Sequence, residues 1–249
     1  MPCRLHPCHE ATTFVSDDHS ADRSLTSRLF GWARGQEASH AEGGRDAGPP
    51  VPTRVIGKIV SGLAGRPSPS ILDLGPVVGP NVAFFGETLG CRLQLADLYA
   101  DLDRISAAGQ DDTLPTFLAD RYSNITDTFD AILCWDFFDY LDKTAAQVLG
   151  RALSARLRPG GLLAAVFQTQ LDPSPIHTKY VIVDAGHLQY RTYPAGRGRR
   201  TVFQNRDIER LFPGLTVIES VLMLNRTREV LLRRPVPAVL RVPPTEPRS

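Results

Sequence analysis

The hydrophobic positions of the chain alternate between short continuous apolar runs and stretches with helical spacing. The apolar runs each predict a buried strand, and they occupy residues 71–74, 91–97, 116–120, 129–135 and 162–167. Apolar residues at helical spacing predict amphipathic helices at 55–63 and 145–157, and further helices are expected at 81–89 and near 100–108. This alternation is typical of an α/β fold with a doubly wound, mainly parallel sheet covered on both faces.

The last part of the chain has a different pattern. Residues 180–193 alternate around a glycine turn and predict a small β-hairpin insertion. A helix at 205–212 precedes two final strands at 215–224 and 229–233. Only Asn225-Arg-Thr-Arg228 separates these strands, and a parallel crossover needs a dozen or more residues, so they form an antiparallel C-terminal hairpin.

The two ends of the chain lack a sustained hydrophobic pattern. Residues 1–50 are rich in Gly, Pro, Ser, Asp and His and are expected to be mostly disordered, with a possible short helix around Leu25, Leu29, Phe30 and Trp32. The Pro-rich tail at 235–249 is expected to be disordered as well. One domain at 51–234 remains between them.

A glycine-containing turn follows the first strand of this domain. The segment Ser70-Ile-Leu-Asp-Leu-Gly-Pro-Val-Val-Gly-Pro80 runs from a strand through Gly75 and Gly79 into a helix. Ligands of open α/β sheets bind at the carboxyl ends of the strands, and glycine permits a close backbone approach. We therefore expect a cofactor at this turn, although such a turn can also be a simple connection.

Composition and net charge limit the kinds of partner that the chain is expected to bind. The 249 residues carry a formal net charge of +1, which argues against an obligate nucleic-acid binder. A late group of arginines is expected to be a solvated face, the alternative being a site for an anion: Arg197, Arg199, Arg200, Arg206 and Arg210. No apolar stretch is long enough to span a bilayer and no signal-peptide pattern begins the chain, so a cytoplasmic location without membrane contact is expected.

The cysteines indicate neither a disulfide framework nor a metal site. Cys91 and Cys134 lie in apolar runs and are expected to be buried as small hydrophobic residues. Cys3, Cys8 and the neighbouring His6 and His9 have no second ligand cluster at zinc-site spacing. We predict no metal.

Over roughly residues 54–234 the sequence resembles the class I S-adenosylmethionine-dependent methyltransferases. The residues that carry the resemblance are Leu72-Asp-Leu-Gly75 with Gly79, the acids Asp97 and Asp120, Phe129-Asp-Ala-Ile-Leu-Cys-Trp-Asp136, and Leu157-Arg-Pro-Gly-Gly-Leu162. The family has a Rossmann-like seven-stranded sheet that ends in an antiparallel hairpin. Dinucleotide-binding domains share the first half of this fold, but their G-x-G-x-x-G pattern is absent because the glycines stand four apart.

The resemblance implies S-adenosylmethionine as cofactor and a role for each matching residue. Asp73, Gly75, Pro76 and Gly79 would surround the methionine moiety. Asp97 would accept hydrogen bonds from the ribose hydroxyls, Leu98 would pack on adenine, and Asp120 with the Arg121 amide would contact its polar edge. Cys134, Trp135 and Asp136 would lie beside the transferred methyl group. Without the resemblance, Asp97 and Asp120 could equally be solvated acids that cap a helix or turn.

One position departs from the family pattern. Where the family usually has a second glycine, this chain has Val77. A valine does not readily adopt positive φ, so the turn either takes another path or leaves less room for the methionine tail. This motivates an alternative, a catalytically inactive methyltransferase-fold protein that serves as a binding or scaffold subunit. A nicotinamide-dependent oxidoreductase is a weaker third possibility.

The sequence leaves the acceptor open. No [DNS]-P-P-[YFW] or Pro-Cys signature follows the fourth strand, so nucleic acid is unlikely and a small molecule or a protein side chain is favoured. The catalytic residues are unknown, and Asp136, His177 and His187 are only candidate bases. The sequence does not indicate an oligomeric state.

Overall fold

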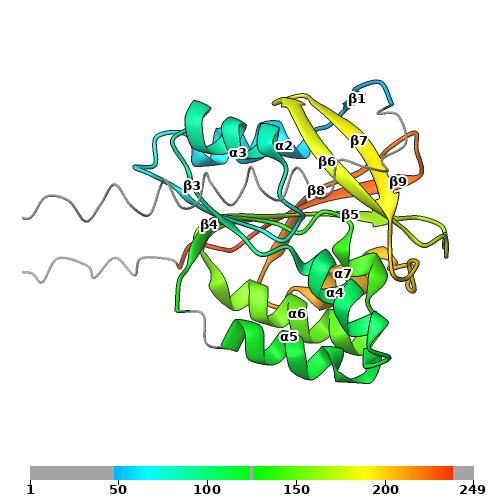
Figure 1. Ribbon diagram of the computed structural model, residues 1–249. Coiled ribbons are helices and arrows are strands. Elements are labelled where there is room, and N and C mark those ends of the chain that lie inside the picture. Colours follow the sequence, from blue (N-terminus) through cyan, green and yellow to red (C-terminus); the bar gives the residue numbers. More distant parts are fainter. Residues whose placement is uncertain (1–47, 124–125, 238–249) are drawn as a thin grey trace, which may run out of the picture.

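The computed structural model describes residues 48–123 and 126–237, in which two sheets and the surrounding helices form one layered body (Figure 1). The strands are β1 (Val51–Pro52), β2 (Ser70–Asp73), β3 (Arg92–Leu95), β4 (Phe129–Leu133), β5 (Leu157–Gln168), β6 (Ile176–Asp184), β7 (His187–Pro194), β8 (Thr216–Leu222) and β9 (Thr227–Arg233). The α-helices are α2 (Val55–Leu63), α3 (Gly79–Val82), α4 (Leu98–Ala107), α5 (Leu114–Ser123), α6 (Lys143–Arg156) and α7 (Asn205–Leu211). Ala83–Thr88 continues α3 as a π-helix. The short helix expected around Leu25 to Trp32 and most of the Pro-rich tail lie outside the described residues.

The main sheet confirms the predicted fold class. Its order is β3-β2-β4-β5-β9-β8, in which β3, β2, β4 and β5 are parallel and β9 and β8 are antiparallel additions at one side. The short turn between β8 and β9 therefore closes an antiparallel hairpin, as predicted. Among the described residues this sheet has six strands, whereas seven were predicted.

The segment predicted as the third strand is helical. Residues 116–120 belong to α5, so the prediction of a strand there was wrong. Leu114, Leu118 and Tyr122 are the buried residues of this segment, and their spacing of four places them on one side of a helix. That periodicity was present in the sequence, but the run Phe117-Leu-Ala119 resembled a short strand.

Each face of the main sheet has its own covering layer (Figure 1). Helices α4, α5, α6 and α7 cover one face, on which Leu72, Ile132 and Cys134 belong to the core. Helices α2 and α3 and the β6–β7 hairpin cover the other face, where Ile71, Leu133 and Trp135 are buried. The strand alternation thus assigns Trp135, just after β4, to the side of the hairpin.

The hairpin insertion was predicted correctly, and the structure shows how it is attached to the rest of the body. β6 and β7 pair antiparallel, and β1 extends them to a three-stranded sheet. Asn81 of α3, which is 3% exposed, fastens the hairpin to the glycine turn. Its side-chain N–H donates to the Tyr180 carbonyl at 2.8 Å, and its carbonyl accepts the Ile182 amide at 2.8 Å. The insertion is therefore a fixed part of the body next to the predicted site.

Candidate functional site

The candidate site, named the crevice below, is the edge of the main sheet where the carboxyl ends of β2, β3 and β4 meet. The chain passes from β2 to β3 on one side and then to β4 on the other, so the strand order reverses next to β2. In open α/β sheets this reversal is where ligands bind. Backbone bonds join the three strand ends: Ala96 donates to the Asp73 carbonyl at 2.8 Å and Leu74 to the Leu133 carbonyl at 3.0 Å. The predicted glycine turn and Asp97 thus lie at one edge of the sheet.

Trp135 follows β4 at this edge and contacts residues from two other elements. Its indole N–H donates to Asp73 Oδ1 at 2.6 Å, and its ring stacks on Tyr180 of β6 at 5.1 Å between centroids. Trp135 has a φ of +49°, a left-handed conformation that is unusual for a bulky residue and occurs most often at functional positions. The side chain is 6% exposed, so it forms part of the buried body.

Gly75 and Trp135 fit one another. A Cβ at Gly75 would lie 2.7 Å from Trp135 Cδ1, too close for any larger residue. Neither Gly75 nor Val77 is among the described residues with positive φ, so the glycine allows a close approach rather than an unusual backbone. Val77 and Val78 are buried at 8% and 9% exposure. The turn has therefore taken a path that valine tolerates, one of the two outcomes expected for Val77.

Asp73 is a buried acid at this edge with a raised pKa. It is 2% exposed, and burial raises its pKa to about 6, although the Gly75 amide and the Trp135 indole both donate to Oδ1 and lower it. The nearby charge of Asp97 raises the pKa slightly further. Such a group beside a glycine turn is typical of functional sites.

Asp97 lies at the carboxyl end of β3, as predicted. It adopts a φ of +41° and caps α4 by accepting the Ala100 amide at 3.3 Å. The side chain is half-buried, and its charge contributes to the raised pKa of Tyr193 on β7, after the larger effect of burial. Asp97 therefore lies within electrostatic range of the hairpin.

The predicted adenine contacts have a different environment. Leu98 is 1% exposed and packs in the core, so its side chain is not open to a ligand. The sequence suggested that Asp120 and Arg121 follow a strand. In the structure they lie near the end of α5. The Arg121 amide is inside the helix, whereas its guanidinium donates to the Ala96 carbonyl at 2.8 Å and pairs with Asp101.

A buried polar cluster lies behind Trp135. Asp136, fully buried, accepts the Tyr99 hydroxyl at 2.6 Å and pairs with Arg199 at 2.7 Å. His177 is also fully buried and contacts Asp103 at 2.9 Å. His187 is exposed beside Asp184. Two of the three candidate bases are thus engaged inside the protein and the third is at the surface.

The arginine prediction was partly wrong. Arg197 and Arg199 are buried at 9% and 6% exposure, where Arg197 pairs with Asp111 at 2.7 Å. They attach the segment after the hairpin to the end of β4. Arg206 and Arg210 are exposed on α7, as expected. The sequence signal for the buried pairs was weak, because no spacing links an arginine to an acid 63 residues earlier.

The remaining composition-based predictions concern the cysteines, metal ligands and membrane spans. Cys91 and Cys134 are free and buried, as expected. Within residues 48–123 and 126–237, no group of three or more His, Cys, Asp or Glu could hold a metal ion. In the same ranges, no helix has the length and apolar character needed to cross a membrane. The Cys3 to His9 cluster lies outside them.

Comparisons with known proteins give similarity at the level of structure alone. No family model matches the sequence, and no curated protein matches it. Solved structures that resemble it include the pyocyanin biosynthetic protein PhzM, with 18% identity and a TM-score of 0.39 over 72% of this chain and 54% of that one. The glycopeptide N-methyltransferase MtfA in complex with S-adenosyl-L-methionine has 14% identity and a TM-score of 0.40 over 74% and 93%.

A third example is 1,6-didemethyltoxoflavin-N1-methyltransferase of Burkholderia thailandensis with S-adenosylhomocysteine bound. It has 16% identity and a TM-score of 0.41 over 90% of this chain and 93% of that one. Several of these neighbours are S-adenosylmethionine-dependent methyltransferases. Similarity at this level carries no argument about the site, whose function has to be inferred from the geometry of the chain itself.

Proposed function

We propose that this chain binds S-adenosylmethionine at the crevice of β2, β3 and β4 and transfers its methyl group to a small molecule or a protein side chain. The observation that carries the proposal is the convergence of the glycine turn, Asp73 and Asp97 at the point where the strand order reverses. When bound, the cofactor supplies the electrophilic methyl group. The chain would then mainly orient the acceptor and exclude water.

The ribose end of the crevice fits this cofactor. Asp97 has a half-buried carboxylate at a strand end, and two acceptor oxygens suit a diol. Tyr193 lies within the reach of the Asp97 charge, and the Arg121 guanidinium donates to the carbonyl of Ala96, which precedes Asp97. We assign ribose binding to Asp97, and we keep Pro76 and Gly79 as residues of the cofactor-binding turn.

The methionine end fits only after a movement. The indole of Trp135 lies against Gly75 and bonds to Asp73, in the place that the methionine tail would need. Tyr180 backs the indole from the hairpin. Binding therefore requires Trp135 to rotate away, and the present conformation is a closed one. No catalytic base is assigned, since Asp136 and His177 are engaged in buried contacts.

The same observation favours a second candidate function. If Trp135 stays in the crevice, the domain is a methyltransferase-fold binding or scaffold protein without catalysis. The mutual fit of Gly75 and Trp135 supports this candidate, because the glycine then accommodates a side chain of the protein instead of a ligand.

Calorimetric titration with S-adenosylhomocysteine separates the two candidates. The enzyme proposal expects saturable binding by the wild type and at least tenfold weaker binding by Asp97→Ala, since each hydrogen bond to a charged group contributes about 1.5 to 3 kcal/mol. Asp112→Ala, which removes an exposed carboxylate, serves as the control and should bind like the wild type.

Trp135→Ala extends the test. If the wild type shows no heat of binding at millimolar ligand and Trp135→Ala shows saturable binding, the crevice is a cofactor site that Trp135 keeps closed, and the scaffold candidate is favoured. If neither protein binds, both cofactor binding and methyl transfer are refuted.

A further inference from the structure

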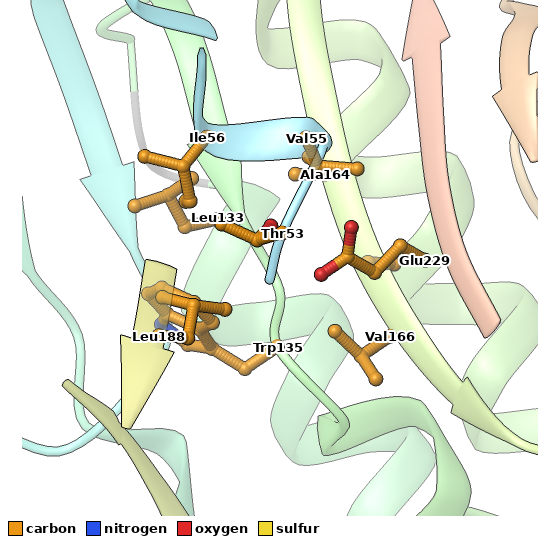
Figure 2. Close-up of a pocket in the computed structure, with 10 residues that line it drawn as sticks. Thr53, Val55, Ile56, Leu133, Trp135, Ala164, Val166, Leu188 and Glu229 are labelled. Atoms are coloured by element: carbon orange, nitrogen blue, oxygen red, sulfur yellow. The ribbon is translucent and has the colours of Figure 1, made fainter. Parts of the chain in front are cut away.

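Cavities in the described part of the chain differ greatly in size. The one beside Trp135, shown in Figure 2, has room for about one water-sized sphere, roughly 10 Å³. A cavity of roughly 210 Å³ lies at the opposite edge of the main sheet, where β2, β3, β4 and β5 begin. Most of its lining residues are polar or charged: Ser70, Arg92, Gln94, Asp127, Thr128 and Arg158. Several of them are exposed, so the cavity is open to solvent.

The strand register groups three hydrogen-bond donors on one face of the sheet. β2 and β3 are parallel, with Ser70 opposite Arg92 and Leu72 opposite Gln94. Paired residues of neighbouring strands, and residues two apart on one strand, have side chains on the same face. That face is the one covered by helices α4 to α7, because Leu72 belongs to its core. The side chains of Ser70, Arg92 and Gln94 therefore lie together beside the cavity.

Arg158 of β5 adds a guanidinium whose position is fixed. Its Nη1 donates to Asp130 Oδ2 at 2.7 Å, and its Nε donates to Thr128 Oγ1 at 3.0 Å. Its Nη2 has no hydrogen-bond partner within residues 48–123 and 126–237. The Arg158 side chain is thus held by the protein and keeps two donors for a ligand.

The positive charges of this region exceed what its buried acid can balance. Asp130 pairs with Arg66 at 2.7 Å and with Arg158, and it accepts the Ser70 amide at 2.8 Å. Burial raises the pKa of Asp130, but the Ser70 amide and the two arginines lower it more, so the pKa is below its usual value. One ionised carboxylate therefore faces two guanidiniums, which are always protonated. Arg92 adds a third, which has no ion pair among the described residues.

We propose that this cavity binds a phosphate group, either as inorganic phosphate or as part of a small phosphate monoester. Arg92 and Arg158 belong to different strands, and a phosphate has enough oxygens to accept hydrogen bonds from both. Ser70 and Gln94 supply neutral donors. A volume of roughly 210 Å³ is many times the about 15 Å³ that one water molecule requires, so a phosphate group has room.

This inference goes beyond the proposed function and does not depend on it. The crevice lies at the carboxyl ends of the strands, whereas Ser70 and Arg92 are the first residues of β2 and β3. The two sites would therefore be occupied independently, from opposite edges of one sheet.

The test is calorimetric titration of the full-length chain at neutral pH and constant ionic strength, in a buffer without phosphate. The probes are inorganic phosphate and glycerol 3-phosphate, and glycerol is the matched neutral control. We expect saturable millimolar binding of at least one phosphate and none of glycerol. Equal affinity for the two probes would identify free phosphate as sufficient, whereas tighter binding of the ester would identify a phosphorylated small molecule as the ligand.

Substitutions assign the binding to this cavity. Arg92→Gln should weaken phosphate binding at least fivefold, and it provides the decision if Arg158→Gln, which takes a partner from Asp130, does not fold. Arg158→Gln should weaken binding at least tenfold. Asp127→Asn, which removes an exposed acid from the lining, should strengthen binding about twofold to threefold. Arg206→Gln, at an exposed position of α7, is the control and should bind like the wild type.

Two results would overturn the inference. The first is no saturable binding of either phosphate at tens of millimolar, in which case the arginines form only a structural ion-pair network at the strand starts. The second is phosphate binding that neither arginine variant of the cavity weakens. A parallel titration with S-adenosylhomocysteine keeps the conclusions apart, since its failure would refute the proposed function and leave the phosphate result unaffected.

Discussion

The raised pKa of Asp73 predicts a specific dependence of stability on pH. Burial under Trp135 raises the pKa from 3.8 to about 6, against two hydrogen bonds that lower it. Because the native pKa lies above that of the unfolded chain, the stabilising contribution is complete below the lower value and is lost as pH rises through the higher one. Asp73→Asn keeps an oxygen for both donors and abolishes this titration.

The magnitude follows from the size of the shift. One pKa unit corresponds to about 1.36 kcal/mol. The difference in bound protons between the native and the unfolded state, integrated from about pH 4.5 to about pH 7.5, gives roughly 2 kcal/mol. The free energy of unfolding of Asp73→Asn, relative to the wild type, should rise by that amount over this range. A constant offset from the new amide group does not change the slope.

Urea unfolding followed by circular dichroism at several pH values measures this difference. Asp112→Asn, which removes an exposed carboxyl group, reports the effect of net charge alone. The reasoning is refuted if the difference between Asp73→Asn and the wild type is independent of pH, or if it falls as pH rises.

Three further predictions concern other parts of the body. Arg199→Met should destabilise the protein by about 3 to 5 kcal/mol in urea unfolding, because it leaves the fully buried Asp136 without its ion pair, and adding Asp136→Asn should recover part of the loss. Val77→Gly should lower the free energy of unfolding by about 2 kcal/mol, since the buried valine already fits its turn. For the same reason the affinity for S-adenosylhomocysteine should be equal or weaker, and a higher affinity would contradict this. A chain that starts at Gly48 should keep the circular dichroism spectrum and melting temperature of the full chain; an unfolded product would show that residues 1–47 are structural.

Much of the main sheet could be predicted from hydrophobic pattern alone. Strands such as Ile71–Leu74 and Leu162–Phe167 are buried on both faces, so they appear as continuous apolar runs. The antiparallel end was predictable because the sequence left only Asn225 to Arg228 between the two predicted strands, too few residues for any other connection. The error at 116–120 came from a five-residue window, which is shorter than the period that identifies a helix.

The location of Gly75 and Asp97 at strand ends could be predicted from the sequence, but the contacts around them could not. Gly75 and Asp97 lie where the pattern of strands and turns placed them, since strand ends are visible in a sequence. The contacts that fill the crevice join residues far apart: Trp135 lies 62 residues from Asp73, and Arg199 lies 63 residues from Asp136. Local spacing contains no information about such contacts.

The hairpin insertion connects these observations. In open α/β sheets, ligands bind at the carboxyl edge where the strand order reverses, and Gly75 lies at this edge. Without β6 and β7, this edge would be open next to Gly75. With them, Tyr180 stacks on Trp135, and Asn81 bonds to the backbone on both sides of Val181. Movement of Trp135 therefore requires either a shift of the hairpin or a rotation of the indole within a fixed frame. The hairpin is tied to α3 by two hydrogen bonds of the Asn81 side chain, whereas the indole is held by one hydrogen bond and ring packing. Rotation breaks fewer hydrogen bonds, so opening of the crevice is expected to begin at Trp135, with its left-handed backbone as the pivot.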